Sequence, residues 1–466
     1  MSTNKFTINE TQKLILNSTL NSEKLVHQAF TNIEWYADFN AFITTDYDRA
    51  LDQAKHQDIS RAKGEVVGSL DGITVAVKDN IHVAGIPNTA GTLALKDFIP
   101  DNAATVVTKL KDAGAIVIGK TNMHELAYGV TSANKAFGAV ANAISKTCFA
   151  GGSSGGTATA VALNMATIGL GTDTGGSVRI PAALNGLVGF RPTVNRYSSN
   201  GLTLISHTRD TVGLITNSVK DAQVVDEVLS NEIEKLGQVS LAKLRIGVPS
   251  KYFYENLEPT IANRAELFLE KLKQVGVELV YADLENISEL NELVGFPVVL
   301  YETKGLLKAY LKHNYPQETV DSLLEKISDP EVKGILEMSL NGSITEETYQ
   351  NAINVARPAL QKLYTTYFDS NHVEAIIFPT TLLSARPING SSETVELNGK
   401  RVPTFQSYIH NTDPGSNAGI PGLSIPLGIS DDGLPFGIEI DGPTGSDRRL
   451  LSIGAELESL IKSVFC

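Results

Sequence analysis

The chain has almost no cysteine and no long apolar run, and each absence excludes a class of protein. Cys148 and Cys466 are the two cysteines among 466 residues, which is too few for a disulfide framework and compatible with a reducing compartment. No uncharged apolar stretch reaches the roughly 18 residues that a transmembrane helix needs. The N-terminus has no basic region followed by an apolar core, so no secretory signal is expected. We therefore expect a cytoplasmic protein without a membrane partner.

Positive charge is also in short supply. The 39 lysines and arginines are outnumbered by 52 aspartates and glutamates, which leaves a net charge of −13. Such an excess of negative charge argues against a nucleic-acid surface and against binding to anionic membranes. The eight histidines show no metal-ligand spacing, so we expect neither a metal nor a cofactor. A small-molecule substrate fits this composition, on a monomer or homodimer with no nucleic-acid partner.

Glycine and serine, by contrast, are concentrated between residues 151 and 181. Residues 151–156, GGSSGG, can adopt backbone conformations closed to other residues and can approach another group closely. The uncharged, alanine-rich run 157–168 predicts a helix that is buried on nearly all sides and begins at this turn. A second glycine turn over residues 171–177 could direct several backbone N–H groups at one oxyanion. The pattern indicates an active-site turn with a serine nucleophile.

Other interpretations of the glycine–serine segment have to be weighed. Such segments are more often flexible linkers, although the buried helix expected directly after this one argues against a linker. A phosphate-binding loop is excluded because no Lys-Ser or Lys-Thr pair follows the glycines. The pattern G-x-S-x-G with Ser154 at its centre also matches a nucleophile elbow, which needs a later histidine. The histidines available for that role are His207, His372 and His410.

A lysine upstream offers a base of a different kind. Lys78 ends a short β-branched strand expected over residues 73–78. Lysines at strand ends are normally solvated. If this lysine is buried, its ammonium form is disfavoured, its pKa falls, and the neutral amine becomes a usable base.

Three motifs together carry a resemblance. Lys78, the GGSSGG turn with Ser153 and the turn GTDTGGS ending at Ser177 occur in this order, with the two serines 24 positions apart. In these motifs the chain resembles the amidase signature family. The resemblance implies Ser–cis-Ser–Lys catalysis, with Ser177 as nucleophile, Ser153 as a bridging serine preceded by a cis peptide bond, and Lys78 as base.

The same resemblance implies further site residues. The oxyanion hole that it implies is formed by the backbone of Thr174, Gly175, Gly176 and Ser177. The substrate-binding residues that it implies are Ala127, Tyr128, Gly129 and Ser154. No metal site is implied.

The resemblance also implies an α/β fold, a single amidase-signature domain whose mixed, mostly parallel sheet is covered by helices on both faces. The residues agree with this fold. A strand at 73–78, a helix at 103–112 and a buried strand at 115–118 predict a parallel sheet covered on both faces.

The domain organisation follows from the helical patterns at the two ends of the catalytic motifs. Periodicity over residues 10–57 predicts N-terminal helices. We expect residues 1–60 to pack as helices on one continuous domain formed by residues 61–466. By the resemblance, a helical insert over about 286–370 covers the substrate.

Several segments outside the catalytic motifs resemble those of bacterial indoleacetamide and mandelamide hydrolases. They include residues 206–211, SHTRDT, residues 413–419, DPGSNAG, and residues 446–451, SDRRLL. This resemblance implies hydrolysis of a primary aryl-acetamide, such as indole-3-acetamide or mandelamide, to a carboxylate and ammonia through an acyl-enzyme; for indole-3-acetamide it implies auxin formation. Two alternatives stay open: the glutamine-hydrolysing amidase subunit of a tRNA-dependent amidotransferase, and a non-catalytic module that binds small amides or anions in its glycine turns.

Five residues near the motifs are given structural roles. We interpret Asp173 and Arg179 as a buried ion pair or loop brace around the second glycine turn. His124 and Glu125 are adjacent, so their side chains point in different directions on any regular element. Cys148 is expected to be a small buried hydrophobe.

Overall fold

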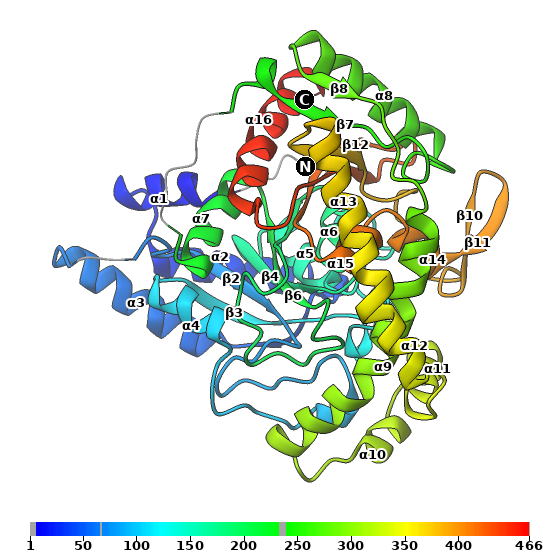
Figure 1. The fold of residues 1–466 in the computed structure, drawn as a ribbon. Helices are drawn as coiled ribbons and strands as arrows, with labels where there is room; N and C mark the ends of the chain where they lie inside the picture. The colour runs from blue at the N-terminus through cyan, green and yellow to red at the C-terminus, as the bar shows by residue number, and fades with distance from the viewer. Residues whose placement is uncertain (1–5, 66–67, 233–238, 466) are drawn as a thin grey trace.

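The fold is built on an 11-stranded sheet whose strands come from segments between residues 42 and 441 (Figure 1). The computed structural model describes residues 6–65, 68–232 and 239–465. In spatial order the strands are β1 (Phe42–Thr45), β3 (Ile116–Thr121), β2 (Thr74–Lys78), β4 (Ile168–Asp173), β6 (Thr211–Thr216), β5 (Val188–Arg191), β12 (Gly422–Ile429), β13 (Pro435–Asp441), β9 (Ala375–Pro379), β7 (Arg245–Gly247) and β8 (Glu278–Val280).

The predicted α/β fold with a mixed sheet is confirmed. Parallel pairing occurs in two blocks, where β2 pairs with β3 and β4, and β7 pairs with β8 and β9. The other six pairings described for this sheet are antiparallel, so the parallel character is confined to these two blocks. The predicted strand–helix–strand unit lies in the first block, and β6, β5, β12 and β13 form the antiparallel centre between the blocks.

Helices cover both faces of the sheet, as expected. On β2, Val75 and Val77 belong to the largest apolar core, whereas Ala76 packs with Ala160 on the other face. The first face is covered by α4 (Thr105–Asp112), α7 (Val219–Ser230), α8 (Pro259–Gln274) and α16 (Asp447–Phe465). The second face carries α5 (Gly155–Ala162) and α6 (Arg179–Leu184), which share an apolar cluster with Ile215 of β6.

The alanine-rich run after the first glycine turn is not one helix. Helix α5 ends at Ala162, residues 163–167 of the predicted helix form a turn, and its last residue, Ile168, begins β4. Gly171, the first residue of the predicted second turn, lies inside this strand together with Gly169, because α5 packs directly on the strand backbone. A Cβ at Gly169 would lie 2.4 Å from Thr157, and one at Gly171 would lie 2.8 Å from the Ser154 hydroxyl.

The N-terminal segment is helical as predicted, with one exception. It forms α1 (Ile8–Leu16), α2 (Ser22–Trp35) and α3 (Tyr47–Ala62). Between α2 and α3, the four residues of β1 pair with β3 and form one edge of the sheet. This segment therefore supplies a strand as well as helices.

The helical insert expected over about 286–370 is present. It consists of α9 (Ile287–Asn314), α10 (Val320–Glu325), α11 (Pro330–Leu340), α12 (Glu346–Asn351), a π-helical turn η5 (Ala352–Ala356) and α13 (Arg357–Asn371). These helices lie together along one side of the molecule, coloured green to yellow (Figure 1). No helix in the described ranges combines the length and the apolar character needed to cross a membrane.

A small hairpin that the sequence did not predict follows the insert. Strands β10 (Thr394–Leu397) and β11 (Lys400–Pro403) pair only with each other in the described structure and project from the side of the molecule (Figure 1). They lead into α14 (Thr404–Ile409) and α15 (Asp413–Ala418). The remaining short elements are 3-10 helices: η1 (Ala37–Phe39), η2 (Leu93–Leu95), η3 (Glu125–Ala127) and η4 (Leu241–Lys243).

Candidate active site

Lys78 ends β2 inside the protein, where it is completely shielded from solvent. Its amine donates hydrogen bonds to the Ser153 Oγ at 2.7 Å, to the Thr172 Oγ1 at 2.8 Å and to the Thr172 carbonyl at 3.3 Å. Burial lowers the pKa of Lys78 to about 7, although the negative charges of Asp173 and Asp210 oppose that shift. A neutral amine can keep both bonds to Thr172 and use its lone pair to accept the Ser153 proton.

Ser153 is held by its backbone at the start of α5. The Gly152–Ser153 peptide bond is cis, as the resemblance implied. The Ser153 carbonyl accepts hydrogen bonds from the His124 N–H at 3.1 Å and from the Ser132 hydroxyl at 3.2 Å. The preceding residue has to be glycine, because a Cβ at Gly152 would lie 2.9 Å from the backbone of residues 130–132.

Ser177 lies on the neighbouring turn and is half-buried against a cavity. The Ser154 N–H donates to the Ser177 carbonyl at 3.1 Å, which joins the two glycine turns through their backbones. Within the described chain, no hydrogen bond connects the hydroxyls of Ser153 and Ser177. The structure thus brings Lys78 and Ser153 into contact, while the link from Ser153 to Ser177 stays a prediction.

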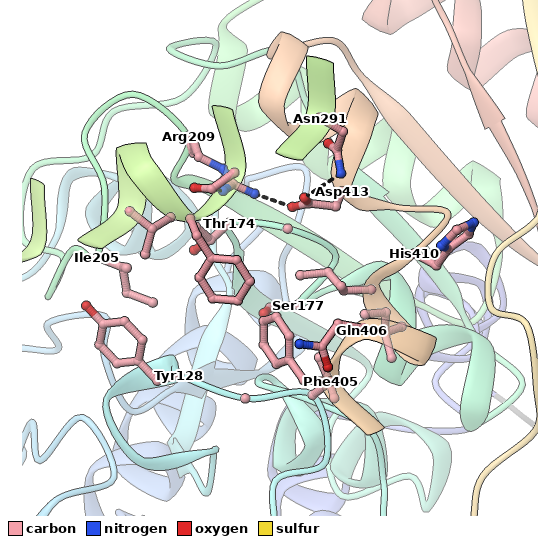
Figure 2. A pocket seen from close by; sticks show the side chains of 18 of the residues that line it. Tyr128, Thr174, Ser177, Ile205, Arg209, Asn291, Phe405, Gln406, His410 and Asp413 are labelled. Carbon is pink, nitrogen blue, oxygen red and sulfur yellow. Dashed lines mark hydrogen bonds and ion pairs between the residues drawn. The ribbon is translucent and has the colours of Figure 1, made fainter. Parts of the chain in front are cut away.

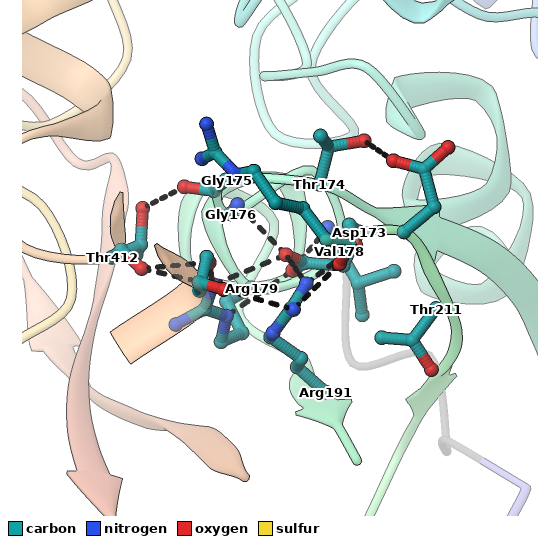
Figure 3. Close-up of polar contacts among 12 residues, drawn as sticks. Asp173, Thr174, Gly175, Gly176, Val178, Arg179, Arg191, Thr211 and Thr412 are labelled. Atoms are coloured by element: carbon teal, nitrogen blue, oxygen red, sulfur yellow. Dashed lines mark hydrogen bonds and ion pairs between the residues drawn. The ribbon is translucent and has the colours of Figure 1, made fainter. Parts of the chain in front are cut away.

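The turn before Ser177 does not offer all the N–H groups predicted for the oxyanion hole (Figure 3). The Gly176 N–H donates to Asp173 Oδ1 at 2.8 Å, and the Gly175 carbonyl accepts from the Thr412 hydroxyl at 2.6 Å. The peptide between Gly175 and Gly176 is therefore tied to the protein at both ends, and the prediction that Gly176 donates to an oxyanion is wrong for this geometry.

The peptides on either side of this one can still donate hydrogen bonds to an oxyanion. The Gly176 carbonyl accepts from the Ile180 N–H at 2.8 Å, so the N–H of the same peptide, which belongs to Ser177, points the opposite way. No acceptor in the described chain contacts the N–H of Thr174, Gly175 or Ser177. Thr174, Gly175 and Ser177 all line the cavity, and their N–H groups are the remaining candidates for oxyanion donors.

A buried charge cluster stands behind this turn (Figure 3). Asp173 is ion-paired with Arg179 at 3.1 Å and with Arg191 at 2.9 Å, and all three side chains are fully buried. Burial by itself raises the pKa of Asp173, but the two guanidinium charges hold that pKa well below its usual range. The prediction of a buried ion pair is confirmed. The Asp173 carboxylate stays ionised and accepts the hydrogen bond of the Gly176 N–H, which is therefore not free for an oxyanion.

The cavity next to Ser177 has a volume of about 290 Å³ (Figure 2). Ala127, Tyr128 and Gly129 lie on its wall, and their role in binding substrate stays a prediction. Ser154 does not line the cavity, because its hydroxyl points into the protein and donates to the Thr172 carbonyl at 3.3 Å.

Parts of the chain after the catalytic motifs supply cavity residues to which the sequence assigned no role. They come from the loop before β6, from α9, from α14 and from the start of α15: Arg209, Asn291, Phe296, Phe405, Gln406 and Asp413. Arg209 and Asp413 belong to the SHTRDT and DPGSNAG segments, so the resemblance marked these stretches without indicating that they meet.

The histidines considered for a nucleophile elbow are not arranged as a base. His410 lines the cavity, but its ring stacks on Tyr252 with centroids 4.0 Å apart and contacts the Tyr252 carbonyl at 3.2 Å. His207 has a side chain that is 61% exposed, and His372 lies just after the end of α13. None of them contacts a site serine in the described chain, whereas Lys78 does.

The other predicted structural roles can be placed. His124 and Glu125 are buried, and Glu125 accepts backbone N–H groups of Ser328 and Asp329 instead of facing the cavity. Cys148 is buried as expected, and Cys466 lies outside the described residues. Across the described ranges, no three His, Cys, Asp or Glu side chains are grouped so that they could hold a metal ion.

Comparisons with known proteins agree with this geometry. The family model described as Amidase matches residues 24–451. An indoleacetamide hydrolase of Allorhizobium ampelinum is 39% identical over 98% of both chains, and a mandelamide hydrolase of Pseudomonas putida is 40% identical over 98% of this chain and 92% of its own. A solved structure described as an amidase superposes with a TM-score of 0.87 at 33% identity, covering 97% of this chain and 99% of its own.

Proposed function

The chain belongs to the amidase family and is an amide-hydrolysing enzyme, and from that premise we propose that its substrates are primary aryl-acetamides. We propose further that Ser177, Ser153 and Lys78 carry the reaction. The observation that carries this proposal is the contact of a buried lysine, whose pKa is about 7, with Ser153, on the turn whose backbone is hydrogen-bonded to the cavity-lining Ser177. The names of the relatives support the same substrate class.

The cavity favours an aromatic acyl group. The rings of Phe296 and Phe405 come from α9 and α14, lie 5.9 Å apart between centroids and both line the cavity. Aromatic rings at this spacing prefer a further ring in an offset or edge-on arrangement. Tyr128 adds a further aromatic side chain to the cavity wall (Figure 2). An aryl ring held there leaves the carboxamide directed at the serine.

The proposed reaction begins with proton transfer. Neutral Lys78 takes the proton of Ser153, which takes the proton of Ser177, so that the Ser177 oxygen attacks the amide carbon. The N–H groups of Gly175 and Ser177 bind the oxyanion, each contributing roughly 3 kcal/mol to the barrier reduction. The C–N bond breaks as Ser153 returns a proton to the leaving nitrogen, which departs as ammonia. Water then attacks the acyl-enzyme along the same proton path and releases the carboxylate.

Ammonia release by the purified single chain tests this function. Indole-3-acetamide, mandelamide, a long-chain fatty amide and glutamine are compared at equal concentration. We expect turnover of the two aryl amides, with kcat/KM at least tenfold above that of the other two. Turnover of glutamine alone, or only after a partner subunit is added, would instead indicate the amidase subunit of an amidotransferase.

The aromatic pair makes a separate prediction. Phe405→Leu keeps an apolar side chain but removes a ring, so kcat/KM for phenylacetamide should fall roughly fivefold, corresponding to about 1 kcal/mol of aromatic contact. For cyclohexylacetamide, which has a six-carbon ring without aromatic character, kcat/KM should fall less than twofold. Leu293→Ala is the control, because Leu293 is an exposed residue of α9 outside the cavity lining. An equal loss for both substrates would contradict aromatic recognition.

A further inference from the structure

An ion pair separates the oxyanion turn from the helix that covers the cavity. The Arg209 guanidinium contacts the Asp413 carboxylate, and both residues line the cavity beside Ser177 (Figure 2). They lie 204 positions apart in the chain. The function proposed above uses neither charge in a chemical step, so the pair needs another explanation.

Two glycines approach this ion pair, one from each of the elements that it separates. A Cβ on Gly175, in the oxyanion turn, would lie 2.9 Å from Asp413 Oδ1 and 3.2 Å from Arg209 Nη2. A Cβ on Gly295, in the middle of α9, would lie 3.3 Å from Asp413 Oδ2. The backbone of the turn and the backbone of the helix thus rest on the ion pair without a side chain between.

The pair is also bonded to α9. The Arg209 Nη1 donates to the Gly295 carbonyl at 3.0 Å, and the Asn291 amide donates to Asp413 Oδ2 at 3.1 Å. Asn417 donates to the same carboxylate oxygen at 3.0 Å and to the Asn291 side-chain oxygen at 2.6 Å. On the other side, the Arg209 carbonyl accepts from Arg191 of the charge cluster at 2.7 Å.

From this arrangement we propose that the Arg209–Asp413 pair is a spacer that sets the distance between α9 and the oxyanion turn. That distance sets the length of acyl group that the site turns over. Arg209 and Asp413 are positioning residues here, because they act through α9 and Gly175. A planar guanidinium suits this role, since its donors stand apart in a rigid fork, whereas a lysine ammonium donates from a single nitrogen on a flexible stem.

The proposal rests on the proposed function in that amide turnover is one of its readouts. The test compares phenylacetamide with 4-phenylbutanamide, whose acyl chain is longer by two methylene groups. Gly295→Ala inserts a methyl group between α9 and the ion pair and forces the helix outward by a few tenths of an ångström. The ratio of kcat/KM for the longer amide to that for the shorter one should rise at least fivefold.

Gly305→Ala is the matched control on the same helix. A Cβ there meets nothing within 4 Å, and the residue lies outside the cavity. Both substitutions replace glycine with alanine inside a helix and favour the helix equally, so an effect of helix stability would appear in both. We expect the Gly305→Ala ratio to stay within twofold of wild type.

Arg209→Lys tests the ion pair itself. It keeps the positive charge but cannot bridge the Gly295 carbonyl and Asp413 as the guanidinium fork does. We expect the ratio of kcat/KM for 4-phenylbutanamide to that for phenylacetamide to rise in Arg209→Lys, as it does in Gly295→Ala. Thermal melting and the fraction of enzyme labelled at Ser177 report separately on whether each variant is folded.

Calorimetry with the two product acids, phenylacetate and 4-phenylbutyrate, repeats the comparison without turnover. If the wild type hydrolyses no amide, the proposed function fails, and the ratio of dissociation constants still tests the spacing. If the long-to-short ratio, of kcat/KM for the amides or of dissociation constants for the acids, is unchanged in Gly295→Ala and Arg209→Lys, the spacer proposal is overturned. An equal change in Gly305→Ala, or a wild type that binds neither acid, overturns it as well.

Discussion

Ser177→Ala is expected to reduce ammonia release from phenylacetamide by about 10⁴-fold or more, because it removes the only atom of that residue that can attack the amide carbon. The fold should be unaffected, since the Ser177 backbone supplies the contact with Ser154. Mass spectrometry after rapid acid quenching should show an acyl adduct on the wild type and none on the variant.

Ser154→Ala is the matched control for that experiment. Ser154 stands at the centre of the G-x-S-x-G pattern, but its hydroxyl points away from the cavity to the Thr172 carbonyl. We expect the variant to keep activity within about tenfold, the effect of one buried hydrogen bond. An inactive Ser154→Ala variant together with an active Ser177→Ala variant would show that Ser154, and not Ser177, is the nucleophile.

The second large effect concerns Lys78 and the dependence of activity on pH. With a pKa of about 7 for Lys78, the neutral amine predominates above that pH. We expect kcat/KM to rise through pH 7 and to level off above it, because only the neutral form accepts a proton from Ser153. For Lys78→Met we expect kcat/KM at pH 8 to be about 10³-fold below that of the wild type, and the rise in kcat/KM through pH 7 to be absent.

The same pKa shift makes a prediction about stability that does not depend on turnover. The Lys78 pKa is lowered from its ordinary value of 10.5 on folding, so between about pH 7 and 10.5 the unfolded chain binds more protons than the native protein. Native stability therefore gains from this group as the pH rises through that window, and the full penalty of a buried charge applies below pH 7. The melting temperature of Lys78→Met relative to wild type should be higher at pH 6 than at pH 9.

A difference in melting temperature that is the same at both pH values would show that Lys78 carries the same charge in the folded and unfolded states. In that case the lysine would be ionised in the active enzyme and could not be the base. A pH profile without a limb near 7 would lead to the same conclusion. The two measurements are independent, because one follows unfolding and the other follows catalysis.

Much of the fold could be predicted from local patterns. The β-branched run before Lys78 and the helices of the N-terminal segment have their own periodicity. The prediction failed where packing overrode the pattern: Gly171 was predicted to begin a turn but lies in β4, because the segment packed against it leaves no room for a side chain. The short strand β1 and the hairpin β10–β11 were missed, since four residues carry too little signal.

The sequence by itself determined the family and the residue types of the catalytic motifs. Each motif is short and continuous, so its glycines and serines specify the local backbone wherever the chain folds. The resemblance that these motifs carry therefore allowed Lys78, Ser153 and Ser177 to be predicted as catalytic residues.

Only the tertiary structure decided which groups meet. It placed the Lys78 amine 2.7 Å from Ser153, committed the Gly176 N–H to Asp173, and set the Arg209–Asp413 pair between Gly175 and Gly295. These contacts join segments of different elements, and a buried amine acquires a pKa near 7 only when other segments exclude water from it. Local sequence carries no record of that burial, because it results from the packing of the whole chain.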